Sequence, residues 1–233
     1  LYKTINNGYT WENITLNSDE DITGICFISA NTGWISLGGK ILKTTDGGEN
    51  WSVQFNNQNN PIYDLYFISD SKGWATSSSK IFKTTDGGEN WLSVETNTTE
   101  SFTSIYFINE NTGWASGKLN GILIKTTDGG ETWNQLSTGT NQISFNANCF
   151  YSNTIGWIVG ENGLIIKTND GGNTWIYLSK GRRENLQSLF FINDEFGWTT
   201  GENGLIKKTT NSGSTWDVLR ENHPEKLYSI FFS

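Results

Sequence analysis

A nine-residue motif that occurs six times constrains the fold of this chain more than any other feature. It is clearest at Lys125-Thr-Thr-Asp-Gly-Gly-Glu-Thr-Trp133, and the steps between the final tryptophans of successive copies are 40, 40, 42, 42 and 41 residues. A regular period of this length is typical of propellers, solenoids and other repeat arrays. The period runs through nearly all of the 233 residues, so we expect a single domain over 1–233.

Each repeat contains four segments with the composition of short strands. The first is an apolar run rich in aromatic and β-branched residues, such as Ser104-Ile-Tyr-Phe-Ile108. A Gly-Trp pair begins the second strand, and in three repeats an Asn-Gly pair then favours a two-residue type I′ turn into the third strand. The motif itself supplies an Asp-Gly-Gly turn into the fourth strand. Four antiparallel strands per repeat, with no helical period, describe one β-propeller blade.

We therefore predict an all-β protein, a β-propeller of about six four-stranded antiparallel blades. Residues 1–16 have the pattern of third and fourth strands and residues 227–233 that of a first strand, with no Gly-Trp strand for this sixth blade. Either the sixth blade is defective or the chain is a fragment of a larger ring, since soluble proteins avoid exposed strand edges. The complete repeats are expected at 23–55, 63–96, 103–137, 146–179 and 187–220.

The aspartate turn has a structural explanation. Its carboxylate can accept hydrogen bonds from turn amides, its glycines permit positive φ, and its tryptophan covers the turn with an apolar face. A role in binding a ligand or metal is the less favoured alternative. Asn6 and Asn211 replace the aspartate in the first and last copies, and we expect those two turns to be looser. The structural role is assigned to Asp46, Trp51, Asp86, Trp91, Asp128, Trp133, Asp170, Trp175, Trp216 and Trp11.

Charge and cysteine content exclude several kinds of function. The formal net charge is -8, with 16 basic against 24 acidic residues, which argues against nucleic acid and anionic membrane as partners. No apolar run approaches the roughly 20 residues that cross a bilayer, so we expect no membrane insertion. Cys26 and Cys149 occupy the same register of two distant repeats, so we expect free, buried thiols.

Candidate functional residues lie in the turns between second and third strands and in the connections between repeats, which share one face of a propeller. Glu161 and Glu202 occupy matching Gly-Glu-Asn-Gly turns and could act as the acid and base of a glycosidase; the favoured alternative is that they are solvated turn residues. Charged and aromatic residues in the same regions are typical interface anchors. The binding candidates are Lys118, Arg182 and Arg183, together with Phe102 and Phe145 unless these two simply begin a first strand.

Catalytic chemistry has no recognisable signature in the sequence. His223 is the only histidine, and no Cys or His pair has metal-ligand spacing, so we expect no metal and no cofactor. Gly-x-Ser-x-Gly does not occur either. The recurring lysine at the end of each third strand could attract an acidic partner, but we favour a role in covering the neighbouring tryptophan.

The motif Ser/Thr-x-Asp-x-Gly-x-Thr-Trp resembles the Asp-box, or BNR repeat, of sialidases, sortilin-type receptors and xyloglucanase-type glycoside hydrolases. With Gly-Trp and a period of about 40 residues it looks most like the photosystem II stability and assembly factor propellers and related secreted bacterial proteins. The resemblance covers the whole chain and implies a propeller, a fold that hosts hydrolases, receptors and assembly factors alike. Sialidases use an arginine triad, and the chain has only Arg182, Arg183 and Arg220. The arginine-rich patch of the assembly factors is also missing, so a role in photosynthesis is not carried over.

Two hypotheses about function follow. The first is a non-enzymatic propeller that binds protein partners as a scaffold or assembly module in an extracellular, periplasmic or cell-surface setting. The alternative is a carbohydrate-binding or glycoside-hydrolase-type module of a larger extracellular protein. Of the 11 tryptophans, five belong to Gly-Trp pairs and six to the motif, so none is left to stack on a sugar.

Overall fold

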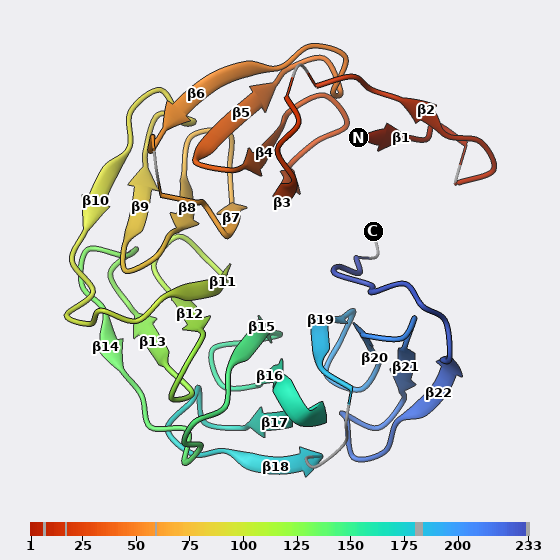
Figure 1. Cartoon of the computed structure of the whole chain (residues 1–233). Helices are drawn as coiled ribbons and strands as arrows, with labels where there is room; N and C mark the ends of the chain where they lie inside the picture. The colour runs from red at the N-terminus through yellow and green to blue at the C-terminus, as the bar shows by residue number, and fades with distance from the viewer. Residues whose placement is uncertain (7, 17, 59, 180–183, 232–233) are drawn as a thin grey trace. The chain divides into compact units, whose positions relative to one another are not determined.

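The computed structural model describes residues 1–6, 8–16, 18–58, 60–179 and 184–231. These residues form short antiparallel strands and one 3-10 turn (Figure 1). The chain divides into two compact units, Leu1–Ser93 and Val94–Ser233. The expectation of a single domain over 1–233 stays a prediction.

The first unit contains a two-stranded sheet followed by two four-stranded antiparallel sheets. In each sheet the spatial order of the strands follows the order of the chain, as in a propeller blade. The last strand extends one residue into the second unit. The strands are β1 (Tyr2–Lys3), β2 (Glu12–Asn13), β3 (Ile22–Phe27), β4 (Gly33–Leu37), β5 (Lys40–Thr44), β6 (Ser52–Asn56), β7 (Asp64–Phe67), β8 (Gly73–Thr76), β9 (Ile81–Thr84) and β10 (Leu92–Val94).

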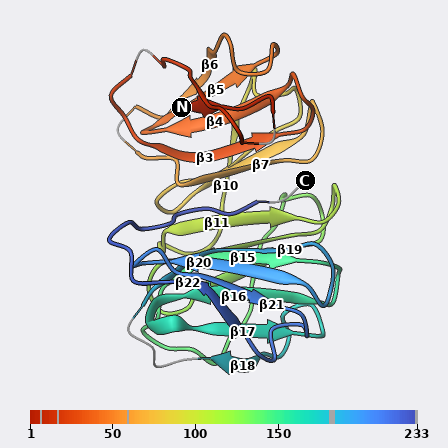
Figure 2. The same cartoon turned by 90° about the vertical axis from the view of Figure 1, so that its right-hand side faces the viewer.

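The second unit contains three more four-stranded antiparallel sheets of the same order. Their first strands, β11, β15 and β19, lie next to one another (Figure 2). The elements are β11 (Phe102–Phe107), β12 (Gly113–Gly117), β13 (Leu123–Thr126), β14 (Asn134–Gln135), β15 (Phe145–Phe150), β16 (Gly156–Gly160), η1 (Glu161–Gly163), β17 (Ile165–Thr168), β18 (Ile176–Ser179), β19 (Leu186–Phe191), β20 (Gly197–Gly201), β21 (Ile206–Thr209) and β22 (Asp217–Arg220). The predicted fold class, a β-propeller of four-stranded antiparallel blades, is confirmed.

The Asn-Gly turns have the predicted conformation. Asn162 has φ 56° and ψ 32°, and Gly163 has φ 63°. The amide of Leu164 donates to the carbonyl of Glu161 at 3.1 Å, which closes a four-residue turn with both central residues in the left-handed region. These are the features of a type I′ turn. The equivalent bond, from the Leu205 amide to the Glu202 carbonyl, closes the turn at Asn203 and Gly204.

The Gly-Trp pairs hold neighbouring blades together. Trp34 of β4 stacks on Phe67 of β7, with ring centroids 3.7 Å apart, and its indole N–H donates to the carbonyl of Gly87 at 3.0 Å. Trp91 meets the same phenylalanine edge to face at 5.8 Å. In the second unit, Trp114 stacks in the same way on Phe150. Phe67, Phe150 and Phe191 are thus each held between two tryptophans. Such aromatic pairs add to the energy of apolar burial.

The glycine of each Gly-Trp pair is needed because the phenylalanine ring lies over it. A Cβ on Gly113 would come within 2.6 Å of the ring of Phe107, its partner across β11 and β12. The recurring lysines cover the second-strand tryptophans, as favoured from the sequence, at Lys43, Lys125, Lys167 and Lys208. The Lys43 ammonium lies 5.1 Å from the Trp34 ring and donates to the carbonyl of Gly87 at 3.2 Å.

The two ends of the chain differ in how well they match the prediction. β1 and β2 pair as third and fourth strands, with Lys3 opposite Glu12. The first strand expected at 227–233 is wrong over its described part, because residues 227–231 have no strand. This segment lies along β19, where the Ile230 amide donates to the Ser188 hydroxyl and Phe231 meets Phe190 at 5.0 Å. Within the described ranges no second strand pairs with it, so it lacks ladder hydrogen bonds.

Candidate functional site

The aspartate turns are closed by their own hydrogen bonds. In the copy at Asp128, the carboxylate accepts from the Thr126 hydroxyl at 2.7 Å, from the Thr132 amide at 2.9 Å and from the Thr132 hydroxyl at 2.5 Å. The Gly130 amide donates to the Thr126 hydroxyl at 2.9 Å. Asp46, Asp86 and Asp170 repeat this arrangement. All four carboxylates therefore accept hydrogen bonds that close their own turns.

These hydrogen bonds favour the ionised carboxylate. The side-chain and backbone bonds from Thr132 are the largest causes that lower the pKa of Asp128 to about 2. The pKa of Asp46, Asp86 and Asp170 is also lowered to about 2, again mainly by bonds from the residue four positions on.

The two asparagine turns keep the hydrogen-bonding arrangement of the aspartate turns, but the bond from the first threonine hydroxyl is longer: 3.0 Å at Asn6 and 3.1 Å at Asn211, against 2.7–2.8 Å at the aspartates. The expectation that these two turns are looser stays a prediction. The Thr10 amide donates to the Asn6 side-chain oxygen at 2.9 Å, and the Thr215 amide does the same to Asn211 at 2.9 Å. The asparagine amide then donates to the hydroxyl of the same threonine at 2.8 Å. Because a hydroxyl can either donate or accept, reversing one bond preserves the turn.

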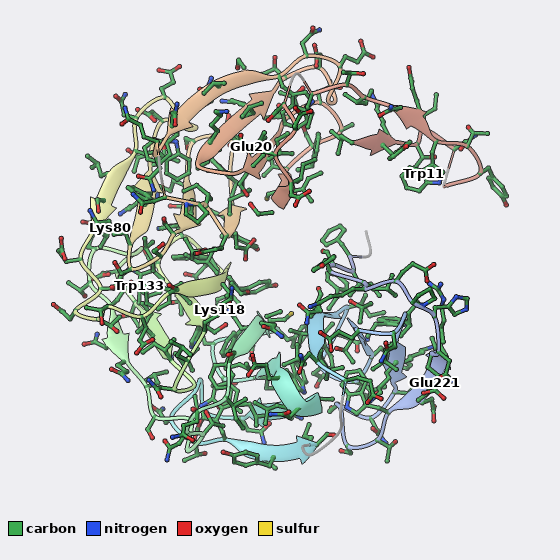
Figure 3. The ribbon with its side chains drawn as sticks, viewed as in Figure 1. Trp11, Glu20, Lys80, Lys118, Trp133 and Glu221 are labelled. Carbon is green, nitrogen blue, oxygen red and sulfur yellow. The ribbon has the colours of Figure 1, made fainter. Side chains whose placement is uncertain are left out.

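The tryptophans of the motif differ in their contacts and in their exposure. Trp51 and Trp175 donate to the glycine carbonyls of their own turns. Trp133 is buried and meets Phe107 edge to face at 5.9 Å (Figure 3). Trp11, at the turn between β1 and β2, is 60% exposed. It lies at an aspartate-type turn, away from the connections between repeats.

The predicted division of the turns between two faces agrees with the backbone hydrogen bonds. Gly47 donates to the carbonyl of Asn31, which joins an aspartate turn to the turn between the first and second strands. The amides of Lys118, Glu161 and Glu202 donate to the carbonyls of Ser101, Ser144 and Asn185 at 2.9, 3.1 and 3.1 Å. In each of these three blades, the bond joins the turn between the second and third strands to the connection that precedes the blade. We call this surface of the second unit the loop face.

Glu161 and Glu202 occupy equivalent positions on the loop face, and both carboxylates accept hydrogen bonds from the backbone. Glu161 accepts from the Ser144 amide at 3.4 Å. Glu202 accepts from the Asn185 amide at 3.3 Å and from the Lys226 ammonium at 3.1 Å. Burial raises the pKa of Glu202, but the bonds from Lys226 and Asn185 outweigh it, so the net pKa is lowered.

Asn185 links the two glutamate turns. Its side-chain oxygen accepts from the Asn162 amide at 3.0 Å, and its side-chain amide donates to Glu202 at 3.3 Å. The sequence-based expectation that these glutamates are turn residues agrees with this network.

Lys118 occupies the position of these glutamates in the β11–β14 blade, but the turn that follows is one residue longer. The extra residue is Leu119, which has φ 64° and is 62% exposed. Lys118 and Asn120 beside it are also exposed, and Asn120 donates to Glu100 at 3.2 Å. Figure 3 shows Lys118 where the chain leaves β12. A bulky apolar residue in the left-handed region is uncommon, since it costs about 1–2 kcal/mol.

A polar groove of about 340 Å³ adjoins this turn. The buried hydroxyls of Thr138 and Thr140 lie 2.7 Å apart at its base. Gly121 is required there, because a Cβ would come within 2.0 Å of the Thr140 hydroxyl oxygen. The sequence analysis did not identify Leu119 or this groove; the extra residue before Asn120-Gly121 was the available signal. The lining residues are Asn120, Gly121, Gln135, Leu136, Ser137, Thr138, Gly139, Thr140 and Asn141.

The remaining binding candidates separate into two groups. Arg182 and Arg183 lie outside the described residues. Phe102 and Phe145 are fully buried and begin β11 and β15, so the alternative that they simply start a strand is correct.

The described residues were also compared with the requirements of a metal site, a reactive cysteine and a membrane-spanning helix. No group of three His, Cys, Asp or Glu side chains among them could hold a metal ion. Cys26 and Cys149 are free, and burial raises the pKa of each thiol to about 11, which disfavours the reactive thiolate. None of the helical segments in the described residues is long and apolar enough to cross a membrane.

The blades and turns define a BNR-type β-propeller, and the comparisons identify its family. The family model for the photosynthesis system II assembly factor YCF48 matches residues 53–144 and 138–227. The chain belongs to this family. A search of curated proteins found no match.

Solved structures share the fold at low sequence identity. A structure described as "YCF48 bound to D1 peptide" is 21% identical, with a TM-score of 0.77 over 99% of this chain and 78% of that one. YCF48 from Cyanidioschyzon merolae is 17% identical, with a TM-score of 0.57 over 89% of this chain and 87% of that one. An ancestral GH74 enzyme is also 17% identical, with a TM-score of 0.71 over 91% of this chain and 33% of its own.

Proposed function

We propose that this chain is a non-enzymatic propeller that binds a polypeptide segment on the loop face of its second unit. The binding surface would be the turn Lys118–Gly121 together with the groove at 135–141. Family membership supports a binding role, since a YCF48 structure of the same fold is described with a bound peptide. The observation that carries the proposal is the exposed, left-handed Leu119.

Leu119 is a suitable anchor because its conformation and exposure both cost stability. The left-handed conformation is unfavourable for leucine, and the exposed side chain gains little apolar burial in return. Strain of this kind in an exposed residue supports a hypothesis of function. Insertion of Leu119 into an apolar pocket of a partner would offset the cost.

The groove beside it suits a peptide backbone. Apart from Leu136, its lining side chains are hydroxyls and amides, which can donate to carbonyls and accept from amides. Lys118 is exposed in the turn that adjoins the groove, and its charge would favour an acidic group on the bound segment.

The glycosidase alternative is disfavoured. A general acid in glycoside hydrolysis has a raised pKa, whereas the net pKa of Glu202 is lowered. Glu161 and Glu202 both accept structural hydrogen bonds. The exposed Trp11 belongs to an aspartate-type turn of the first unit, so it provides no stacking platform for a glycan on the loop face of the second unit.

A peptide display library selected against the full 233-residue chain tests the proposal. We expect selected peptides to bind saturably and to lose about tenfold or more in affinity for Leu119→Gly, because glycine tolerates the backbone conformation without the side chain. The matched control is Leu219→Ala, which removes a similarly exposed leucine from β22. Equal affinity for Leu119→Gly and the wild type would contradict the proposed surface, and saturable binding of glycans alone would favour the alternative.

We also propose an extracellular, periplasmic or cell-surface location, on the basis of the resemblance to secreted propellers and of the Asn-, Ser- and Thr-rich connections. Immunodetection in fractionated source cells tests this. Recovery in the cytoplasmic fraction alone would contradict it.

A further inference from the structure

The groove of the proposed binding surface borders an aromatic side chain from the next blade. Tyr177 lies on β18, the last strand of its sheet, opposite Ile166 of β17. Its hydroxyl oxygen lies 3.8 Å from the position that a Cβ on Gly139 would take, and Gly139 lines the groove. Tyr177 is 41% exposed. The groove is therefore bordered by residues of two blades of the second unit.

Gly139 leaves open the space in front of this tyrosine. It has φ 70°, and apart from the Tyr177 hydroxyl no atom of the described residues outside 138–140 lies within 4 Å of its Cβ position. A ligand side chain that enters the groove at this point would therefore meet the phenol of Tyr177.

The equivalent positions of the other fourth strands in the second unit hold no aromatic ring. They are Gln135 and Val218, which pair with the same position of their third strands as Tyr177 does. Val218 is 42% exposed, so exposure does not distinguish it from Tyr177. The distinguishing feature is the aromatic ring, and this ring is the one that borders the groove. Tyrosine is also among the residues that most often carry the energy of an interface.

We propose that the peptide site continues across the blade boundary to Tyr177 and takes an extended segment that carries an aromatic side chain. This inference rests on the proposed function and adds a residue that determines its specificity. The aromatic ring of the segment would lie over Gly139 and pack against the phenol, because two aromatic rings gain more than their apolar burial alone. The backbone of the segment would bond to the hydroxyls and amides that line the groove.

The strongest-binding peptide from the display selection is the probe, and anisotropy of its fluorescein-labelled form follows binding to the full chain. We expect Tyr177→Ala to weaken binding about fivefold, as the loss of an aromatic pair implies, and Tyr177→Phe to keep the affinity of the wild type. The matched control is Val218→Ala, which changes the equivalent position at nearly the same exposure and should leave the affinity unchanged.

A second variant fills the space instead of removing the ring. Asparagine tolerates the left-handed conformation, so Gly139→Asn should fold and place its side chain in front of Tyr177. We expect it to weaken binding about fivefold or more, because the aromatic side chain of the segment is then excluded. Unchanged affinity for Gly139→Asn would overturn the inference.

A double-mutant cycle assigns the contact. One aromatic residue of the peptide, when replaced by leucine, should weaken binding to the wild type about fivefold but binding to Tyr177→Ala less than about twofold, because the contact is already lost. Additive losses would overturn the inference, as would selected peptides that lack an aromatic residue.

The result for Leu119→Gly separates this inference from the function on which it rests. A loss of affinity for Leu119→Gly with none for Tyr177→Ala would overturn the inference and leave the proposed surface in place. Unchanged affinity for both variants would contradict the proposed surface and the inference with it. Equal losses for Tyr177→Ala and Val218→Ala would also overturn the inference, because the effect would not depend on the groove.

Discussion

At the scale of single residues, the repeated turns use one hydrogen-bonding plan with two different acceptors. Asp128 accepts from the hydroxyl of Thr132, whereas Asn211 donates to the hydroxyl of Thr215. The threonine hydroxyl adapts to either partner. The aspartate and the asparagine are therefore two ways of closing the same turn, and only the aspartate makes the stability of its turn depend on pH.

Asp128→Asn should leave stability near pH 7 almost unchanged, because Thr132 can accept as Thr215 does. Asp128→Ala removes the acceptor for the Thr126 hydroxyl and the Thr132 amide, so we expect a loss of about 1 kcal/mol in the free energy of unfolding. Urea unfolding of both variants checks this. Equal losses for the two would show that the negative charge, and not the hydrogen bonds, stabilises the turn.

Leu119→Gly should not destabilise the protein, although it removes a side chain. Glycine has no steric penalty at φ 64°, so we expect the free energy of unfolding to stay equal or to rise by about 1 kcal/mol or less. Thermal unfolding beside the wild type measures this. A clear loss of stability would mean that Leu119 packs against the protein and is not poised for a partner.

At the scale of elements, the blade interface depends on the second-strand tryptophan. Trp157→Ala removes a fully buried ring that stacks on Phe191 and donates to the Ser212 carbonyl, so we expect a loss of about 3–5 kcal/mol. Trp11→Ala removes an exposed ring, and we expect a change within about 0.5 kcal/mol. Chemical unfolding of the two variants compares them. Similar losses would contradict the distinction between a tryptophan buried between two blades and the exposed Trp11.

Sequence reasoning predicted the elements that depend on local chemistry and missed those that depend on neighbours. The Asn-Gly turns and the aspartate turns were predictable because positive φ and self-bonding are encoded within a few residues. The segment 227–231 has the composition of a first strand, but a strand also needs a partner with which to form a ladder.

The candidate site was predictable only in part. Lys118 was identified by its charge, whereas the conformation of Leu119 follows from one extra residue between Gly117 and Ile122, which are themselves hydrogen-bonded. The residues around Leu119, and those that line the groove with Thr138 and Thr140, have the composition of ordinary polar turns. Composition alone therefore predicts neither the left-handed conformation of Leu119 nor the groove.

At the scale of the whole molecule, four equivalent carboxylates should control stability in acid. Their folded pKa of about 2 lies below the ordinary 3.8, so their contribution is complete above pH 3.8 and is lost as pH falls towards 2. We expect a melting temperature that is steady from pH 5 to 7 within about 2 degrees and falls between about pH 4 and 2. The control is Asp128→Asn, whose melting temperature should fall less over the same interval. A wild-type melting temperature that does not fall between about pH 4 and 2 would contradict the assigned pKa values.

The central claim is that the second unit binds polypeptide through the Lys118–Gly121 turn and its groove. Hydrogen exchange of the full chain, with and without a peptide selected on it, tests this most directly. We predict slower exchange at residues 117–121 and 136–144 and no change at the aspartate turns. Protection confined to the aspartate turns, with the Lys118–Gly121 turn unchanged, would contradict the claim.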